Sequence, residues 1–168
     1  MISIREYSEP YRERMIAHIL AIQRDEFGIA ITRADQPDLD NIETFYRTGA
    51  GNFWLAIDGG KVVGTVALID IGGRQAALRK MFVAPAYRGA PHNTAGLLLE
   101  TLLAWAGGKG LREIYLGTTA KFLAAHRFYE KKGFAAIAQA DLPPAFPVMK
   151  VDSKFYKYSI GRSEAPRC

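Results

Sequence analysis

The feature that most constrains the fold is a pair of apolar runs separated by a short polar turn. Residues 53–57 and 61–69 are each long enough for a strand, and the Asp-Gly-Gly segment between them has the composition of a hairpin turn. A further extended run over residues 76–83 ends before Pro85, whose nitrogen has no proton to donate to a strand ladder. The sequence therefore predicts an antiparallel meander before the middle of the chain.

On either side of this meander, the apolar residues recur at helical spacing or form short strands. Ahead of it we expect a strand over residues 2–4, a helix that starts near Ser8 and ends before Phe27, and a shorter helix over residues 39–46. After it we expect helices over residues 94–107 and 121–132 and strands over residues 113–117, 134–139 and 154–160. This order of elements is that of a mixed α/β (α+β) protein.

The length of 168 residues is that of one domain. We expect a single domain over residues 1–160 and a frayed polar tail over residues 161–168. No export signal and no membrane span is visible, and the one cysteine is Cys168, so no disulfide framework is expected. The sequence therefore favours a cytoplasmic protein without a membrane partner.

The net charge of +5 raises the question of nucleic-acid binding. Lys and Arg are spread over the whole chain and alternate with acids, as in Arg12-Glu13-Arg14, so that no basic run is present. A solvated, mildly basic surface is the simpler interpretation. We expect no nucleic-acid partner.

The segment that follows the meander is predicted to form a strand, a glycine-containing loop and a leucine-rich helix. The unpaired N–H groups and the positive dipole end of a helix N-terminus can bind a pyrophosphate, and Arg88 would add charge. The fingerprints G-x-G-x-x-G and G-x-x-x-x-G-K-[ST] of nucleotide sites are both absent. By itself, this pattern is shared by many helices that follow such a loop.

Two motifs make a specific resemblance. Residues 83–89 are V-A-P-A-Y-R-G and residues 128–134 are F-Y-E-K-K-G-F. In this order and at this distance they resemble the two ends of the acetyl-coenzyme A binding core of the GNAT superfamily of N-acetyltransferases. The resemblance implies a central mixed, mostly antiparallel sheet of about six to seven strands flanked by about four helices. It also implies acetyl-coenzyme A as co-substrate, no metal, and transfer of the acetyl group to a primary amine by direct attack on the thioester.

The chain departs from the GNAT pattern between the two motifs. Asn93 stands where the family has the first glycine of its pyrophosphate loop, Arg88 lies too far upstream, and residues 90–92 look like an insertion. Asn tolerates positive φ and is a good helix N-cap, so Asn93 can replace the glycine. It stays open which N–H groups face which phosphate and whether Arg88 contacts one.

By resemblance, the cofactor-binding residues are Met81, Phe82, Val83, Arg88, Gly89, Asn93, Thr94, Ala95, Gly96, Phe122 and Tyr129. The backbone of Met81 and Val83 would hold the acetyl carbonyl and the pantetheine amides, as a strand edge holds an extended chain. The catalytic residues would be Met81, whose N–H faces the oxyanion, and Tyr129, the general acid for the sulfur. Without the resemblance, Met81 and Val83 are core residues and Tyr129 is a packed aromatic residue on an amphipathic helix.

The general base stays open. Asp25, Glu26 and Glu43 fall in or near the two N-terminal helices, although each is also typical of a surface carboxylate, and a chain of water molecules would serve equally well. His126 lies one turn before Tyr129, where a lone histidine is more often structural or exposed.

The acceptor side is the least constrained. The proline-rich residues 141–149 predict a loop whose apolar side chains line the acceptor pocket or pack over the core. The resemblance implies a small-molecule or peptide amine as acceptor, with a protein lysine and an acyl group larger than acetyl also open, and a homodimer is compatible with the sequence. The alternative function is a sensor that binds acyl-coenzyme A without turnover. It is motivated by the inserted loop and by Phe122, where the family often has an Asn whose contact would move to Thr118 or Thr119.

Overall fold

The computed structural model describes residues 1–119 and 122–161 of the chain. Its strands are β1 Ile2–Glu6, β2 Asn52–Asp58, β3 Lys61–Gly72, β4 Gln75–Val83, β5 Glu113–Thr118, β6 Ala135–Ile137 and β7 Lys154–Ser159. Its α-helices are α1 Arg12–Leu20, α2 Ile42–Phe45, α3 Thr94–Gly108 and α4 Leu123–Lys131. Of the tail predicted to fray, residues 162–168 lie outside the described ranges.

The first helical segment follows from its sequence. Pro10 lies in a 3-10 turn ahead of α1, where the missing N–H has no helical partner to lose. The helix continues past α1 as a π-turn over Ala21–Glu26, and the chain leaves it at Gly28, whose φ of 64° suits glycine. The helix predicted to end before Phe27 is confirmed, although Ser8 makes no side-chain capping bond at its start.

The strands form one seven-stranded sheet in the order β1-β2-β3-β4-β5-β7-β6. Strands β2 to β4 make the predicted antiparallel meander, with a hairpin between β2 and β3, and β1 pairs antiparallel with β2. β5 runs parallel to β4 because α3 crosses between them, and β7 lies antiparallel between β5 and β6. The mixed, mostly antiparallel sheet and its four α-helices confirm the predicted fold class.

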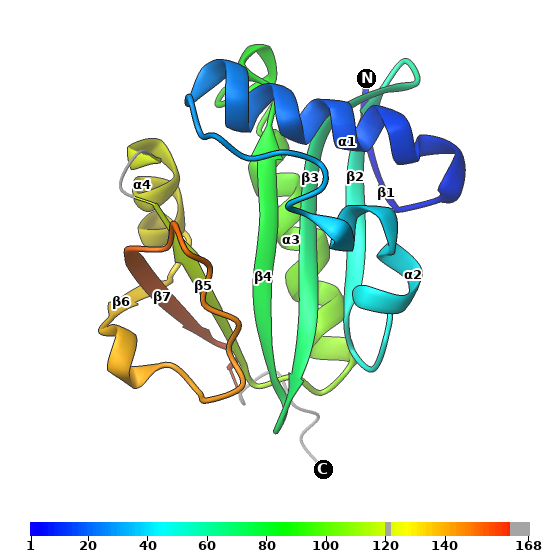
Figure 1. Cartoon of the computed structure of the whole chain (residues 1–168). Coiled ribbons are helices and arrows are strands. Elements are labelled where there is room, and N and C mark those ends of the chain that lie inside the picture. The colour runs from blue at the N-terminus through cyan, green and yellow to red at the C-terminus, as the bar shows by residue number, and fades with distance from the viewer. Residues whose placement is uncertain (120–121, 162–168) are drawn as a thin grey trace.

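Helices cover both faces of the sheet. Figure 1 shows α1 and α2 in front of β2 to β4 and α3 behind them. The α1 side closes over a core that contains Met15 and Phe53, and the α3 side over one that contains Leu98 and Leu102. Gly64 of β3 lets α3 approach the sheet, because a Cβ there would lie 3.0 Å from the Leu98 Cδ1. The two cores hold the helices that border the site described below.

β4 and β5 pair only at their first residues. The pairs that join them are Gln75 with Glu113, Ala76 with Ile114 and Ala77 with Tyr115. β5 pairs along its whole length with β7, and beyond Ala77 the strands β4 and β5 separate (Figure 1). The backbone of Leu78–Val83 therefore has no strand partner on this side of β4.

Some predicted ends differ from the structure. β6 covers Ala135–Ile137 and not residues 134–139, because Phe134 packs into the core and Gln139 begins a 3-10 turn. The predicted start of the last helix at Lys121 lies in the gap of the described residues, and α4 is described from Leu123 onward.

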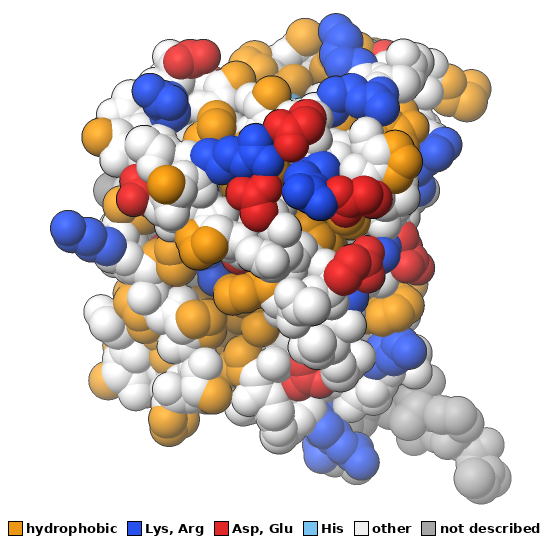
Figure 2. Space-filling model, turned by 45° about the vertical axis from the view of Figure 1, so that its right-hand side comes forward, with side chains coloured by type: hydrophobic (Ala, Val, Ile, Leu, Met, Phe, Trp, Pro, Cys, Tyr) orange, Lys and Arg blue, Asp and Glu red, His pale blue; other side chains and the backbone are white. Residues whose placement is uncertain are grey.

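Basic and acidic side chains are intermixed on the face that Figure 2 presents. Among the described residues, Arg33 lies 2.8 Å from Glu13 and 2.5 Å from Asp40, both as ion pairs. The surface has the mixture of charges that the sequence predicts.

Candidate active site

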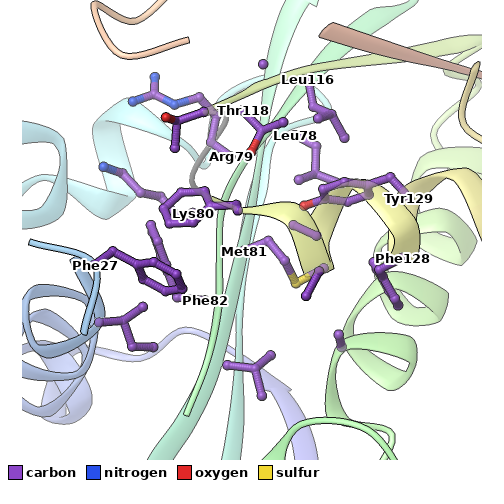
Figure 3. Close-up of a pocket in the computed structure, with 18 of the residues that line it drawn as sticks. Phe27, Leu78, Arg79, Lys80, Met81, Phe82, Leu116, Thr118, Phe128 and Tyr129 are labelled. Carbon is purple, nitrogen blue, oxygen red and sulfur yellow. The ribbon is translucent and has the colours of Figure 1, made fainter. Parts of the chain in front are cut away.

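A cavity of about 610 Å³ opens where β4 and β5 separate. Its walls come from the second half of β4, the end of β5, α4, the end of the first helical segment and the loop before β7. Figure 3 shows Leu78 and Met81 of β4, Leu116 of β5 and Tyr129 of α4 grouped around this space. Elements far apart in the sequence thus meet at one cavity.

Most of the predicted cofactor-binding residues line this cavity, namely Met81, Phe82, Val83, Arg88, Gly89, Ala95, Phe122 and Tyr129. Thr118 and Thr119, the predicted alternatives to a polar contact at Phe122, line it as well. The predicted residues Asn93, Thr94 and Gly96 are not part of its wall and form the start of α3 beside it.

The start of α3 is built around Asn93. Its φ of 53° confirms that it takes the left-handed conformation of the glycine it replaces. Asn93 is the N-cap residue of α3, as predicted, but its side chain makes no capping hydrogen bond, and its amide lies so close to Gly96 that any Cβ there would overlap it. Thr94 turns its hydroxyl inward and donates to the Tyr87 carbonyl at 2.9 Å. Within the described residues, no hydrogen bond satisfies the N–H groups of Thr94, Ala95 and Gly96, which is the donor arrangement that an anion requires.

Arg88 has protein partners in this structure. Its Nε donates to the Val83 carbonyl at 2.8 Å, and its two terminal nitrogens donate to Glu26 at 2.5 and 2.7 Å. Arg88 therefore links the loop before α3 to the end of the first helical segment, across the mouth of the cavity. Contact between Arg88 and a phosphate stays a prediction.

β4 contains a bulge at the middle of the cavity wall. The register shifts between Thr65 and Ala67 of β3, and Lys80 has a φ of 58°. The Thr65 hydroxyl donates to the Lys80 carbonyl at 2.6 Å, which fixes the bulge from the neighbouring strand. The strand consequently presents Arg79, Lys80 and Phe82 on the α1 side and Met81 on the α3 side, as Figure 3 shows for their side chains.

The Lys80 side chain ends in a buried polar cluster. Its Nζ donates to the Gln36 Oε1 at 2.5 Å and lies 3.8 Å from Asp38, whose carboxylate also accepts the Tyr46 hydroxyl at 2.5 Å. Gln23 and Gln36 exchange two side-chain hydrogen bonds behind it. Burial lowers the pKa of Lys80 to about 8, although Asp38 favours the charged form. The sequence reasoning missed this cluster, although two successive cations in a half-buried strand are a sign of a bulge.

The model of the acetyltransferase (GNAT) family matches residues 16–134, which is more than half of the chain. The chain belongs to this family. A crystal structure of a GNAT-family acetyltransferase from Staphylococcus aureus Mu50 is 42% identical, with a TM-score of 0.91, and the match covers 96% of this chain and 100% of that one.

Two further comparisons show how far the likeness extends. An N-acetylaspartate synthetase of Xenopus tropicalis is 40% identical over 99 residues, which are 58% of this chain and 36% of that relative, so the chain spans little more than a third of it. The paia N-acetyltransferase from Thermoplasma acidophilum, solved in complex with coenzyme A, is 17% identical with a TM-score of 0.70, over 95% of this chain and 99% of that one. Acetyl-coenzyme A is the co-substrate of the GNAT family.

Tyr129 occupies the position of the GNAT tyrosine motif and is buried. Its ring packs against Phe134 and Tyr156, and Figure 3 shows its phenol oxygen directed toward β4. Burial raises the pKa of Tyr129, so the phenol keeps its proton at neutral pH. Among the described residues, its hydroxyl has no hydrogen-bond partner. Tyr129 is thus a packed aromatic residue whose hydroxyl is free to donate a hydrogen bond, and its role as general acid stays a prediction.

Phe122 closes one side of the GNAT cavity with aromatic contacts. Its ring lies 4.7 Å from that of Phe27 and 6.3 Å from that of Phe82, both edge to face. Phe27 follows the first helical segment and Phe122 precedes α4, so this contact joins the two helical walls. Phe122 is therefore part of an apolar wall at the position where the GNAT family often has an Asn that makes a polar contact.

The candidates for the general base are either bound by an arginine or lie outside the cavity wall. Glu26 is bound by Arg88, and Glu43 is bound by Arg47 at 2.7 Å outside the cavity. Asp25 is exposed and is not part of the wall. The His126 ring contacts the Thr119 carbonyl at 3.0 Å, as expected for a structural histidine.

Asp152 is a lining carboxylate that the sequence reasoning missed. It accepts the Met149 N–H at 2.9 Å, and burial raises its pKa. Phe146 and Met149 of the proline-rich loop also line the cavity, and Phe146 packs edge to face on Phe155 at 6.5 Å. The loop therefore lines the cavity and packs on the core, and its contact with the acceptor stays a prediction.

Within the described ranges, no group of three or more His, Cys, Asp or Glu side chains is placed to hold a metal ion. Over the same residues, every helix is too short or too polar to cross a membrane.

Proposed function

We propose that the protein transfers an acetyl group from acetyl-coenzyme A to a primary amine. The observation that carries this function is the unpaired edge Leu78–Val83 of β4, which lies in one cavity with Met81 and Tyr129. An extended pantetheine chain can hydrogen-bond to such an edge as an added strand does. The free N–H groups at the start of α3 then receive the pyrophosphate, next to the end of β4.

The transfer is a direct attack on the thioester. The amine nitrogen forms a bond to the carbonyl carbon, and the carbon–sulfur bond breaks as the tetrahedral intermediate collapses. The Met81 N–H donates to the oxyanion, a contact that typically stabilises the transition state by about 3 kcal/mol. The proton that leaves the nitrogen balances the one gained by the sulfur.

Tyr129 supplies the sulfur with its proton. A buried phenol of raised pKa is a weak acid, so its hydrogen bond to the sulfur strengthens as negative charge builds there, and the proton follows when the carbon–sulfur bond breaks. Water returns the proton lost by the amine to the phenol. No lining carboxylate is needed as base in this scheme.

The named relatives support an amine acceptor. N-acetylaspartate synthetase is, by its name, an enzyme that makes an acetylated amino acid. We further propose, as the sequence predicts, one domain over residues 1–160, a cytoplasmic location, a small-molecule or peptide acceptor and no nucleic-acid partner. A homodimer stays compatible with these proposals.

Tyr129→Phe tests the reaction. Since the hydroxyl makes no hydrogen bond to the described part of the protein, Phe should preserve the packing and the stability. Loss of a general acid typically lowers turnover by about 100-fold or more. We expect kcat for thiol release from acetyl-coenzyme A to fall by that factor, while the affinity for acetyl-coenzyme A, measured by calorimetry, stays within about threefold.

Tyr158→Phe is the matched control, because Tyr158 lies on β7 outside the cavity wall. It should leave both measurements unchanged. If acetyl-coenzyme A binds but no amine releases the thiol, the protein is a sensor of acyl-coenzyme A and not an acetyltransferase. If the wild type turns over and Tyr129→Phe equals it, acetyl transfer stands and Tyr129 is not its general acid.

A further inference from the structure

The charged residues of the cavity wall are mostly cations. Among the described lining residues, the cations are Arg79, Lys80, Arg88, Arg127 and Lys131, and the carboxylate is Asp152. A wall of this composition attracts anions and repels amines that carry several positive charges. The excess of positive charge therefore favours an anionic co-substrate and an acceptor that does not carry several positive charges.

The cations divide between the two sides of β4. Arg127 and Lys131 lie on α4, on the side where the co-substrate is proposed to bind, whereas the Arg88 guanidinium is paired with Glu26 at the end of the first helical segment. Arg79 and Lys80 extend from β4 toward α1 and α2, away from Tyr129 (Figure 3). The bulge brings these two successive side chains to the same face.

Arg79 and Lys80 differ in their partners. Lys80 has Asp38 and Gln36, which compensate its charge and its hydrogen bonds. Arg79 is half-buried, and its guanidinium makes no hydrogen bond or ion pair within the described residues. A guanidinium in a partly apolar cavity is strongly stabilised by a carboxylate that it can bind through two parallel hydrogen bonds.

Asp152 is the carboxylate among the described lining residues, and the positive charge of Arg79 acts on it, lowering its pKa against the larger effect of burial. Its carboxylate accepts the Met149 N–H and lies against Gly117, where a Cβ would be 2.5 Å from its Oδ2. No ion pair joins Asp152 to Arg79 in the structure. The hydrogen-bond donors of the Arg79 guanidinium are therefore available to a carboxylate that comes from a ligand, although Asp152 acts on its charge.

The rest of this side of the cavity is apolar. Ile29 and Ile31 of the loop after the first helical segment are half-buried there, and Phe146 of the proline-rich loop also lines the cavity. These side chains can cover the apolar body of a small acceptor.

We propose that the acceptor is an amino acid with an apolar side chain and that Arg79 binds its carboxylate. This inference rests on the proposed acetyl transfer and specifies the substrate class. Arg79 holds the acceptor from the α1 side of β4 while the amino group faces the thioester on the other side of the bulge. A polyamine is disfavoured at this place, because its positive charges would lie beside the Arg79 guanidinium and apolar side chains.

The test compares each amino acid with its own amide as acceptor. Leucine and phenylalanine are assayed beside leucinamide and phenylalaninamide, which keep the amine and the side chain but lack the carboxylate. The amide has the less basic amine, so the neutral nucleophile is more abundant in the control and the comparison is biased against the proposal. We expect kcat/KM to be at least about tenfold higher for the amino acids.

Arg79→Gln should remove this preference. We expect kcat/KM for the amino acids to fall by about 10- to 100-fold, since a charge-assisted pair is lost, and kcat/KM for the amides to stay within about threefold. The KM for acetyl-coenzyme A should not change. Arg112→Gln removes the same charge from an exposed position at the start of β5, outside the cavity, and should change none of these values.

Three outcomes overturn the substrate class while acetyl transfer stands. The amides or putrescine have the higher kcat/KM, or Arg79→Gln lowers kcat/KM equally for the amino acids and their amides. The third is that aspartate has a higher kcat/KM than the apolar amino acids. If no acceptor releases the thiol, acetyl transfer itself fails. If Arg79→Gln does not fold, Arg79→Lys is tested in its place. A lysine keeps the charge without the paired hydrogen bonds, so this variant should retain a reduced preference for the amino acids over their amides.

Discussion

Because the ammonium group of Lys80 is buried, the free energy of unfolding of the protein should change with pH in the alkaline range. Burial lowers the pKa of Lys80 from 10.5 to about 8 in the folded protein. Each pKa unit corresponds to about 1.4 kcal/mol, so keeping Lys80 protonated in the folded state costs about 3 kcal/mol at neutral pH. This cost disappears once the unfolded chain also loses the proton.

Lys80→Met removes the titrating group and keeps a side chain of similar length. Because the folded pKa is the lower one, the unfolded chain binds more protons between about pH 8 and pH 10.5, and stability rises with pH across that window. We expect the wild-type free energy of unfolding, relative to that of the variant, to rise by about 3 kcal/mol between about pH 7 and pH 10.5.

Urea denaturation of both proteins across this pH range measures the difference. Tyrosines such as Tyr46, whose pKa is raised by burial, also titrate at high pH, but they are present in both proteins and cancel. A difference that stays constant with pH would refute the lowered pKa. A difference that falls with pH would mean that Asp38 outweighs the burial. Lys80→Gln, which keeps a donor for Gln36, repeats the measurement if the Met variant is too unstable.

Two further substitutions test the support of the site. Burial lowers the pKa of His18, whose ring contacts the Phe82 carbonyl at 2.9 Å, so the wild type should lose stability as pH falls below about 6.5, and acid denaturation of His18→Gln should show a weaker dependence. Gly64→Ala should destabilise the protein by about 1–3 kcal/mol in urea denaturation, since its Cβ would lie 3.0 Å from Leu98 and 3.1 Å from Thr94, both buried. If Gly64→Ala instead stabilises the protein, the start of α3 is looser than the structure shows.

The parts of the fold that the sequence predicts are those set by local patterns. Two apolar runs on either side of an Asp-Gly-Gly turn determine the hairpin, and a run of leucines after a left-handed residue determines α3. The motif ending in Phe134 places Tyr129 at the cavity because the spacing within one helix is fixed. Asn93 could be predicted as left-handed because only a few residue types accept that conformation.

The parts that could not be predicted depend on contacts between distant segments. Whether Arg88 meets a phosphate or a carboxylate depends on Glu26, which is 62 positions away. The burial of the Lys80 ammonium group depends on Gln36, which is 44 positions away. No local sequence pattern contains either pairing. Which charged side chains are paired near the cavity therefore depends on how the first helical segment and the loop after it pack in the folded protein.

The unpaired edge of β4 also bears on aggregation. A free strand edge normally invites pairing with another chain, and proteins cover or charge such edges to prevent it. Here the edge lies inside the sheet, between walls formed by α4 and the first helical segment, with the Phe27–Phe122 contact across them. A foreign strand with full-sized side chains has little room there, whereas a thin amide chain fits. The protein thus keeps backbone donors and acceptors available to a substrate without offering them to its own copies.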